Sequence, residues 1–277
     1  MTYRTIALTL VADGESAHDS AAGWAIAAAA RAGAHLAVGI GVLPIIVPSE
    51  ATVSGLPTYE EENLGLRKQA EALAERIRGD AQRAGASASV EVASQPFQSY
   101  SRKLLRIARL SDLCVVAAPM QTAPFSSDAA IDVLMGSGAP TVIVPKDWND
   151  FGPIDSIVVG WDESAQAARA ARGALPMMRE AEKVDVVCVI DDKKLSSAAP
   201  GADMAEYLAR HSRKVVETEL PVGRGDAADA LVQHAKLNRA KLLVMGAYGH
   251  ARLREFVFGG ATRSMLWHAE IPTLMAH

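Results

Sequence analysis

The sequence has only two cysteines in 277 residues, and it has no cluster of metal-ligating side chains. Cys114 and Cys188 each lie in an apolar, strand-like run, so we expect two buried, inert thiols. A cytoplasmic chain has no oxidising setting that forms disulfides, and no partner cysteine lies at ligand spacing. The seven histidines include no His-x-x-x-His pair. The sequence therefore predicts neither a disulfide nor a metal site.

A strong charge of one sign and a long apolar run are also missing. The 28 basic and 32 acidic residues leave a net charge of −4, which gives no general attraction to nucleic acid or to an anionic membrane. The longest uncharged run, residues 32–49, contains Pro44 and Pro48 and does not suit a membrane span. The N-terminus has no signal-peptide cleavage pattern. We expect a cytoplasmic protein with no nucleic-acid or membrane partner, in which any anion is held locally.

An internal repeat divides the chain into two halves. Residues 140–145 resemble residues 272–277, and residues 110–117 resemble residues 239–246. The intervening segment, 146–153, is rich in Asp, Asn, Gly and Pro and is the natural linker.

Apolar, β-branched strands alternate with amphipathic helices in the second half. The expected strands are 156–160, 184–190, 215–220 and 241–245, and the expected helices are 164–180, 202–213, 226–237 and 260–268. This alternation is typical of a parallel sheet covered on both faces. The predicted fold class is α/β, with two tandem doubly wound parallel-sheet (Rossmann-like) domains, residues 1–146 and 154–277.

One long helix is predicted in the first half, after a connection rich in proline. Thr58 to Glu61 can form a capping box for it. An apolar stripe that should pack on the sheet follows at three- and four-residue steps: Leu66, Ala70, Leu73, Ile77, Ala81 and Ala84.

A glycine-rich segment follows the strand at 241–245. Gly246 and Gly249 permit close backbone approach and positive φ, and Gly259 and Gly260 precede the last predicted helix. Free N–H groups at a helix start attract anions, so the segment predicts a phosphate-binding loop. Such glycines also form ordinary turns, and the motif alone does not decide between the two.

Two further positions lie at the same predicted edge of the sheet. Asp162 follows the strand at 156–160, and Val189 lies at the end of the strand at 184–190. Ligands of doubly wound sheets bind at the carboxyl ends of the strands. Asp162 could accept a hydrogen bond from an exocyclic amine such as that of adenine, and Val189 could flank the base. An N-cap role for Asp162 is an equal interpretation.

The second half resembles the nucleotide-binding subclass of universal stress proteins. The resemblance lies in the pattern Gly246-x-x-Gly249-nine residues-Gly259, together with Asp162 and Val189. The chain looks like a tandem member of that family, whose domains are adenine nucleotide alpha hydrolase-like. The resemblance implies ATP or another adenine nucleotide, with Mg²⁺ as an option. Asp162 and Val189 would hold the base, and the glycine loop would hold the ribose and phosphates. It also implies a cytoplasmic sensor or regulator of stress adaptation.

One departure from the family pattern concerns the residue after the last glycine, which is Gly260 instead of Ser or Thr. Losing one neutral hydrogen bond costs about 1 kcal/mol, whereas micromolar binding corresponds to about 8 kcal/mol, so affinity should fall without vanishing. Thr262 could supply a hydroxyl or could cap the last helix. His250 could approach a phosphate tail or stay solvated.

The first half lacks the glycine pattern, because Ala117 and Met120 stand where the second half has Gly246 and Gly249. We expect this half to be a degenerate scaffold in a within-chain pseudo-dimer. The last strands, 141–144 and 273–276, are expected to pair within the chain, although pairing in a homodimer stays open.

No nucleophile-and-base set and no Gly-x-x-x-x-Gly-Lys-Ser/Thr loop is present, so no catalytic residue is predicted. The leading interpretation is a nucleotide-binding sensor. A slow ATPase and a nucleotide-free structural dimer that binds a protein partner are the alternatives.

Overall fold

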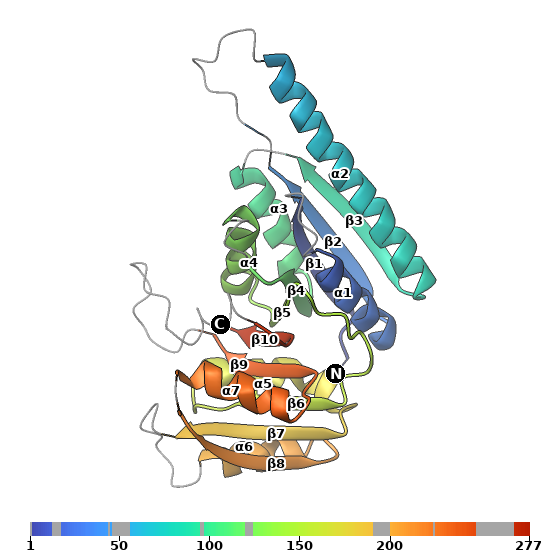
Figure 1. Ribbon diagram of the computed structural model, residues 1–277. Coiled ribbons are helices and arrows are strands. Elements are labelled where there is room, and N and C mark those ends of the chain that lie inside the picture. Colours follow the sequence, from blue (N-terminus) through green and yellow to red (C-terminus); the bar gives the residue numbers. More distant parts are fainter. Residues whose placement is uncertain are drawn as a thin grey trace.

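The chain forms one ten-stranded sheet with helices on both faces (Figure 1). The computed structural model describes residues 2–12, 18–43, 45, 56–94, 97–119, 124–190, 200–223, 225–247 and 269–277. The strands are β1 (Thr5–Ala12), β2 (His35–Val42), β3 (Ser87–Ser94), β4 (Leu113–Ala117), β5 (Thr141–Val144), β6 (Ser156–Gly160), β7 (Lys183–Ile190), β8 (Val215–Pro221), β9 (Leu242–Gly246) and β10 (Thr273–Ala276). The helices are α1 (His18–Ala32), α2 (Leu56–Arg83), α3 (Phe97–Arg109), α4 (Pro124–Gly136), α5 (Ala165–Met178), α6 (Pro200–Ala209) and α7 (Ala227–Leu237).

The two halves share one strand order, which confirms the predicted α/β class. The sheet order is β3-β2-β1-β4-β5-β10-β9-β6-β7-β8, so each half has its first strand between its second and its fourth. The order reverses between β6 and β9, as it does between β1 and β4. Such a reversal is the point where doubly wound sheets open a crevice.

The halves meet at β5 and β10, and these strands form the one antiparallel pair of the sheet as described. Thr141 lies opposite Met275, and Ile143 lies opposite Thr273. The expected pairing of the last strands within the chain is therefore confirmed. The carboxyl end of β10, at the carboxyl edge of the second half, thus lies beside the amino end of β5.

Two apolar layers cover the sheet. One contains residues of α1, α2, α5 and α6, and the other contains residues of α3, α4 and α7. Strand side chains alternate between them, as at Ile6 and Ala7, because successive residues of a strand face opposite sides. Both cysteines are buried and free; burial raises the pKa of the Cys114 thiol to about 12.

The linker is held against both halves. The ring of Phe151 lies over Gly23, where a Cβ would come within 2.6 Å of it, and its carbonyl accepts a hydrogen bond from Arg31 at 2.7 Å. Asp150 forms an ion pair with Lys241. The hydroxyl of Tyr3 donates to the carbonyl of Gly173 in α5 at 2.5 Å. The halves are therefore joined by packing as well as by the sheet.

The long helix α2 begins at Leu56, so the capping box predicted at Thr58 is wrong. Thr58 lies in the first turn, where proline at position 57 is tolerated because its missing N–H needs no partner there. The predicted stripe packs as expected from Leu66 to Ala81, and Ala84 is exposed.

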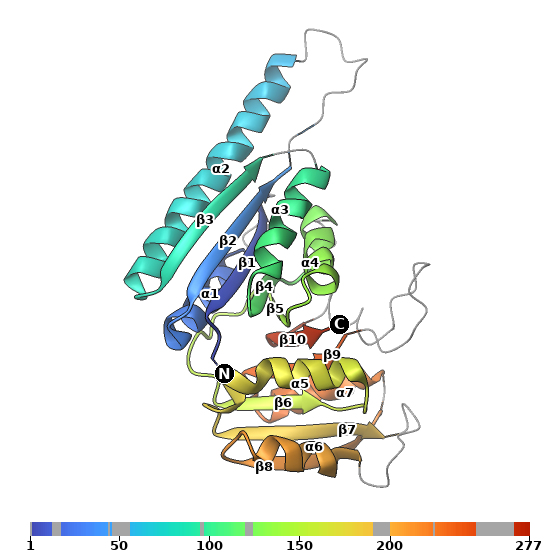
Figure 2. The same ribbon diagram turned by 180° about the vertical axis from the view of Figure 1, so that it is seen from behind.

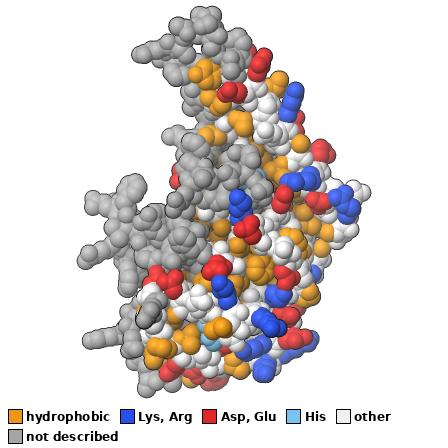
Figure 3. All heavy atoms as spheres, viewed as in Figure 1, with side chains coloured by type: hydrophobic (Ala, Val, Ile, Leu, Met, Phe, Trp, Pro, Cys, Tyr) orange, Lys and Arg blue, Asp and Glu red, His pale blue; other side chains and the backbone are white. Residues whose placement is uncertain are grey.

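The sheet twists strongly between the halves, so the strands of the first half run steeply in Figures 1 and 2 and those of the second half run across the view. Basic and acidic side chains are interspersed over the face in Figure 3, including along α2. Within the described ranges, no helix combines the length and apolar character that a bilayer span requires.

Candidate functional site

A tight connection joins β6 to α5 at the carboxyl edge of the second half. Asp162 is half-buried, and its Oδ1 accepts a hydrogen bond from the backbone N–H of Ser164 at 3.1 Å. Glu163 between them has a φ of 61°, a left-handed conformation that costs a non-glycine residue about 1 to 3 kcal/mol. This turn fixes the Asp162 carboxylate at the edge of the sheet.

Ser164, and not Asp162, is the N-cap of α5. Its backbone is extended, and its hydroxyl accepts the N–H of Ala167 at 3.0 Å. The N-cap interpretation of Asp162 is therefore wrong. Serine directly before an alanine-rich helical stretch is itself a start signal, so the sequence could have identified this cap.

Val189 lies at the end of β7, next to this turn. Gly160 is in register with Val187, and the N–H of Trp161 donates to the Val187 carbonyl at 2.9 Å. Continuing the parallel register by two residues brings Asp162 level with Val189. Val189 is half-buried against the α7 side of the core.

The charge at this end of β7 is acidic. Burial, followed by the carboxylates of Glu217, Glu219, Glu163 and Asp162, raises the pKa of the Cys188 thiol to about 11. Cys188 directly precedes Val189, so these carboxylates act on the same strand end. Such a field favours a hydrogen-bond donor, such as an amine, over a phosphate.

Gly246 ends β9 against the first turn of α5. A Cβ at this position would lie 2.6 Å from the backbone nitrogen of Ala167 and 3.0 Å from Gln166. Of the two properties that glycine permits here, Gly246 uses the close approach to the α5 backbone and not a positive φ. The N–H of Ala247 donates to the Ala276 carbonyl at 2.9 Å.

The structure therefore brings three predicted residues, Asp162, Val189 and Gly246, to the ends of three adjacent strands, β6, β7 and β9 respectively. The structure does not describe the part of the chain that contains the other predicted site residues, which are Gly249, His250, Gly259, Gly260 and Thr262.

The first half has the corresponding edge without the glycine. Ala117 is in register with Val144, as Gly246 is with Ala276, which confirms that these positions correspond. Met120 lies outside the described residues.

Comparison with protein-family models matches residues 153–277 to the universal stress protein family. A curated universal stress protein from Synechocystis sp. is 29% identical over 136 residues. That match covers 49% of this chain and 46% of the relative, so it spans about half of each protein.

Solved universal stress proteins share the architecture of both halves. A structure from Archaeoglobus fulgidus has a TM-score of 0.73 at 14% identity, covering 98% of this chain and 95% of its own. A putative universal stress protein from Pseudomonas aeruginosa has a TM-score of 0.57 at 15% identity, with 98% and 92% covered. At these identities the likeness shows the fold alone. Residues 153–277 therefore belong to the universal stress protein family, and the chain as a whole has the fold of solved members.

Proposed function

We propose that residues 154–277 form a domain that binds an adenine nucleotide, and that residues 1–146 form a degenerate domain that supports it. The observation that carries the proposal is the convergence of Asp162, Val189 and Gly246 at the point where the strand order reverses. The family match to the same half of the chain supports it.

The proposed ligand is ATP or a related adenine nucleotide, with Mg²⁺ accompanying its phosphates. Asp162 accepts a hydrogen bond from the exocyclic amine, and Val189 packs against the base. Gly246 begins the segment that holds the ribose and phosphates through Gly249, Gly259 and Gly260. The acidic field around Cys188 supports this orientation, because it disfavours phosphates at the base end.

His250 and Thr262 complete the proposed phosphate end of the site. The protein would act in the cytoplasm as a sensor or regulator of stress adaptation. Nucleotide occupancy, and not turnover, would be its output. The phosphates would lie beside the ends of β9 and β10, away from the carboxylates around Cys188.

Asp162→Asn tests the proposal, because the amide keeps an oxygen for the Ser164 N–H and removes only the charge. Charge-assisted hydrogen bonds exceed neutral ones by about 1 to 2 kcal/mol, so we expect ATP affinity to fall about tenfold by calorimetry. Asp155→Asn, an exposed change at the opposite edge of the sheet, is the matched control. Equal affinity in both variants would count against a base site at Asp162.

A further inference from the structure

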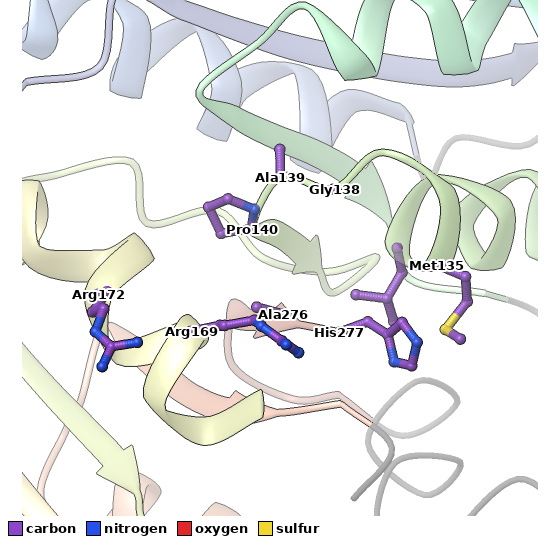
Figure 4. A pocket seen from close by; sticks show the side chains of 9 residues that line it. Met135, Gly138, Ala139, Pro140, Arg169, Arg172, Ala276 and His277 are labelled. Atoms are coloured by element: carbon purple, nitrogen blue, oxygen red, sulfur yellow. The ribbon is translucent and has the colours of Figure 1, made fainter. Parts of the chain in front are cut away.

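A hollow of about 200 Å³ lies at the seam between the two halves (Figure 4). The first half contributes Met135 and Pro140, and the second half contributes Arg169 and Arg172 from α5 together with His277. Neither half lines this pocket alone. No acidic side chain is among its lining residues as described.

Both arginines are exposed residues of α5. They lie three residues apart on α5, where like charges repel by a few tenths of a kcal/mol. The helix has no Asp or Glu to offset them, and among the described residues neither guanidinium has an ion-pair partner. The pocket thus concentrates positive charge in a chain whose net charge is −4.

The volume decides what class of ligand fits. A water molecule occupies about 30 Å³, and sites for drug-sized ligands start at about 300 Å³. A hollow of about 200 Å³ is therefore too small for a nucleotide and large enough for one oxyanion with water. Guanidinium groups bind phosphate through paired N–H donors, and Leu134, Met135 and Pro140 form apolar walls beside them.

We propose that this seam pocket binds a small oxyanion, a phosphate group, through Arg169 and Arg172. Two sources can supply that group. Ala276 lines the pocket and is in register with Gly246, so the pocket adjoins the end of the proposed nucleotide crevice. The phosphate is therefore either a free ion or the terminal phosphate of a bound nucleotide. The pocket's charge and volume do not depend on the proposed nucleotide site.

The test is calorimetric titration of inorganic phosphate at low ionic strength into the wild type, Arg169→Gln, Arg172→Gln and the double variant. We expect each single change to weaken phosphate binding about tenfold or more, and the double change to abolish it. Arg213→Gln, at an exposed position after α6, is the control and should bind like the wild type. Circular dichroism checks that each variant is folded.

Parallel titrations with ATP and AMP identify the source. If the double variant loses phosphate binding and keeps ATP affinity, the pocket holds a free anion. If it weakens ATP and not AMP, the pocket holds the terminal phosphate. Phosphate and ATP affinities that are the same in the double variant and in Arg213→Gln would overturn the proposal, as would a wild type that binds neither. If the wild type binds phosphate but binds neither ATP nor AMP, the result contradicts the proposed function and leaves the seam pocket standing.

Discussion

Gly246 serves the packing of α5 as well as the proposed site. A Cβ would meet the backbone of Ala167 at 2.6 Å, and a helix backbone cannot move aside as a flexible side chain can. We therefore expect Gly246→Ala to lower the free energy of unfolding by about 2 kcal/mol, a typical cost of overpacking, as measured by urea denaturation.

The matched control is Gly65→Ala in α2, where nothing lies within 4 Å of the added Cβ. Alanine is the better helix former, so this change should raise the free energy of unfolding by about 0.5 to 1 kcal/mol. Similar effects at the two glycines would contradict the packing role of Gly246. Bulkier changes at Gly246 would disturb folding and binding together, and Asp162→Asn is for that reason the cleaner test of binding.

At the scale of elements, a buried carboxylate ties β7 to β8 and α7. Asp185 accepts hydrogen bonds from Thr218 at 2.9 Å and from His234 at 3.0 Å, and Lys183 lies 3.4 Å from it. Its side chain is only 3% exposed. A buried charge is tolerated when several donors replace its water, as they do here.

Asp185→Ala should lower the free energy of unfolding by about 3 kcal/mol or more, because it leaves His234 and Thr218 without their acceptor in the core. Glu219→Ala, an exposed change on β8, should alter it by less than about 0.5 kcal/mol. Chemical denaturation of both variants checks this. A smaller effect at Asp185 than at Glu219 would contradict the structural role of the network.

Elements of the second half could be predicted closely because their apolar runs are short and bounded by turn residues. β6 has the predicted bounds, β7 begins one residue earlier than predicted, and β9 is shifted by one residue at both ends. The end of α6 at Ala209, four residues early, could not be predicted because no glycine or proline marks it. The role of Asp185 could not be predicted from the sequence, because Thr218 and His234, which bind it, lie on other elements.

The candidate site could be predicted in part for the same reason. Parallel strands bring their carboxyl ends to one edge, so Asp162, Val189 and Gly246 could be placed together from the sequence. The packing of Gly246 against α5 could not be predicted, because it depends on a contact between segments about 80 residues apart in the sequence. The seam pocket also needs both halves in place before it exists.

At the scale of the whole molecule, the continuous sheet and the anchored linker should make the halves unfold together. Trp24 is buried in the first half and Trp161 lies in the second, so each reports on one half. In variants that keep one of them, with the other three tryptophans changed to Phe, fluorescence and circular dichroism should give one coincident urea transition. A transition seen by Trp161 that is separate from the circular dichroism change would show independent halves.

We propose a single adenine nucleotide site per chain, in the second half. Its most direct measurement is to denature the purified protein, quantify any released nucleotide by chromatography, and titrate nucleotide-free protein with ATP and Mg²⁺ by calorimetry. We predict one adenine nucleotide per chain, because Ala117 and Met120 replace the glycines in the first half. No binding at millimolar ATP, or two equivalent sites per chain, would contradict the account.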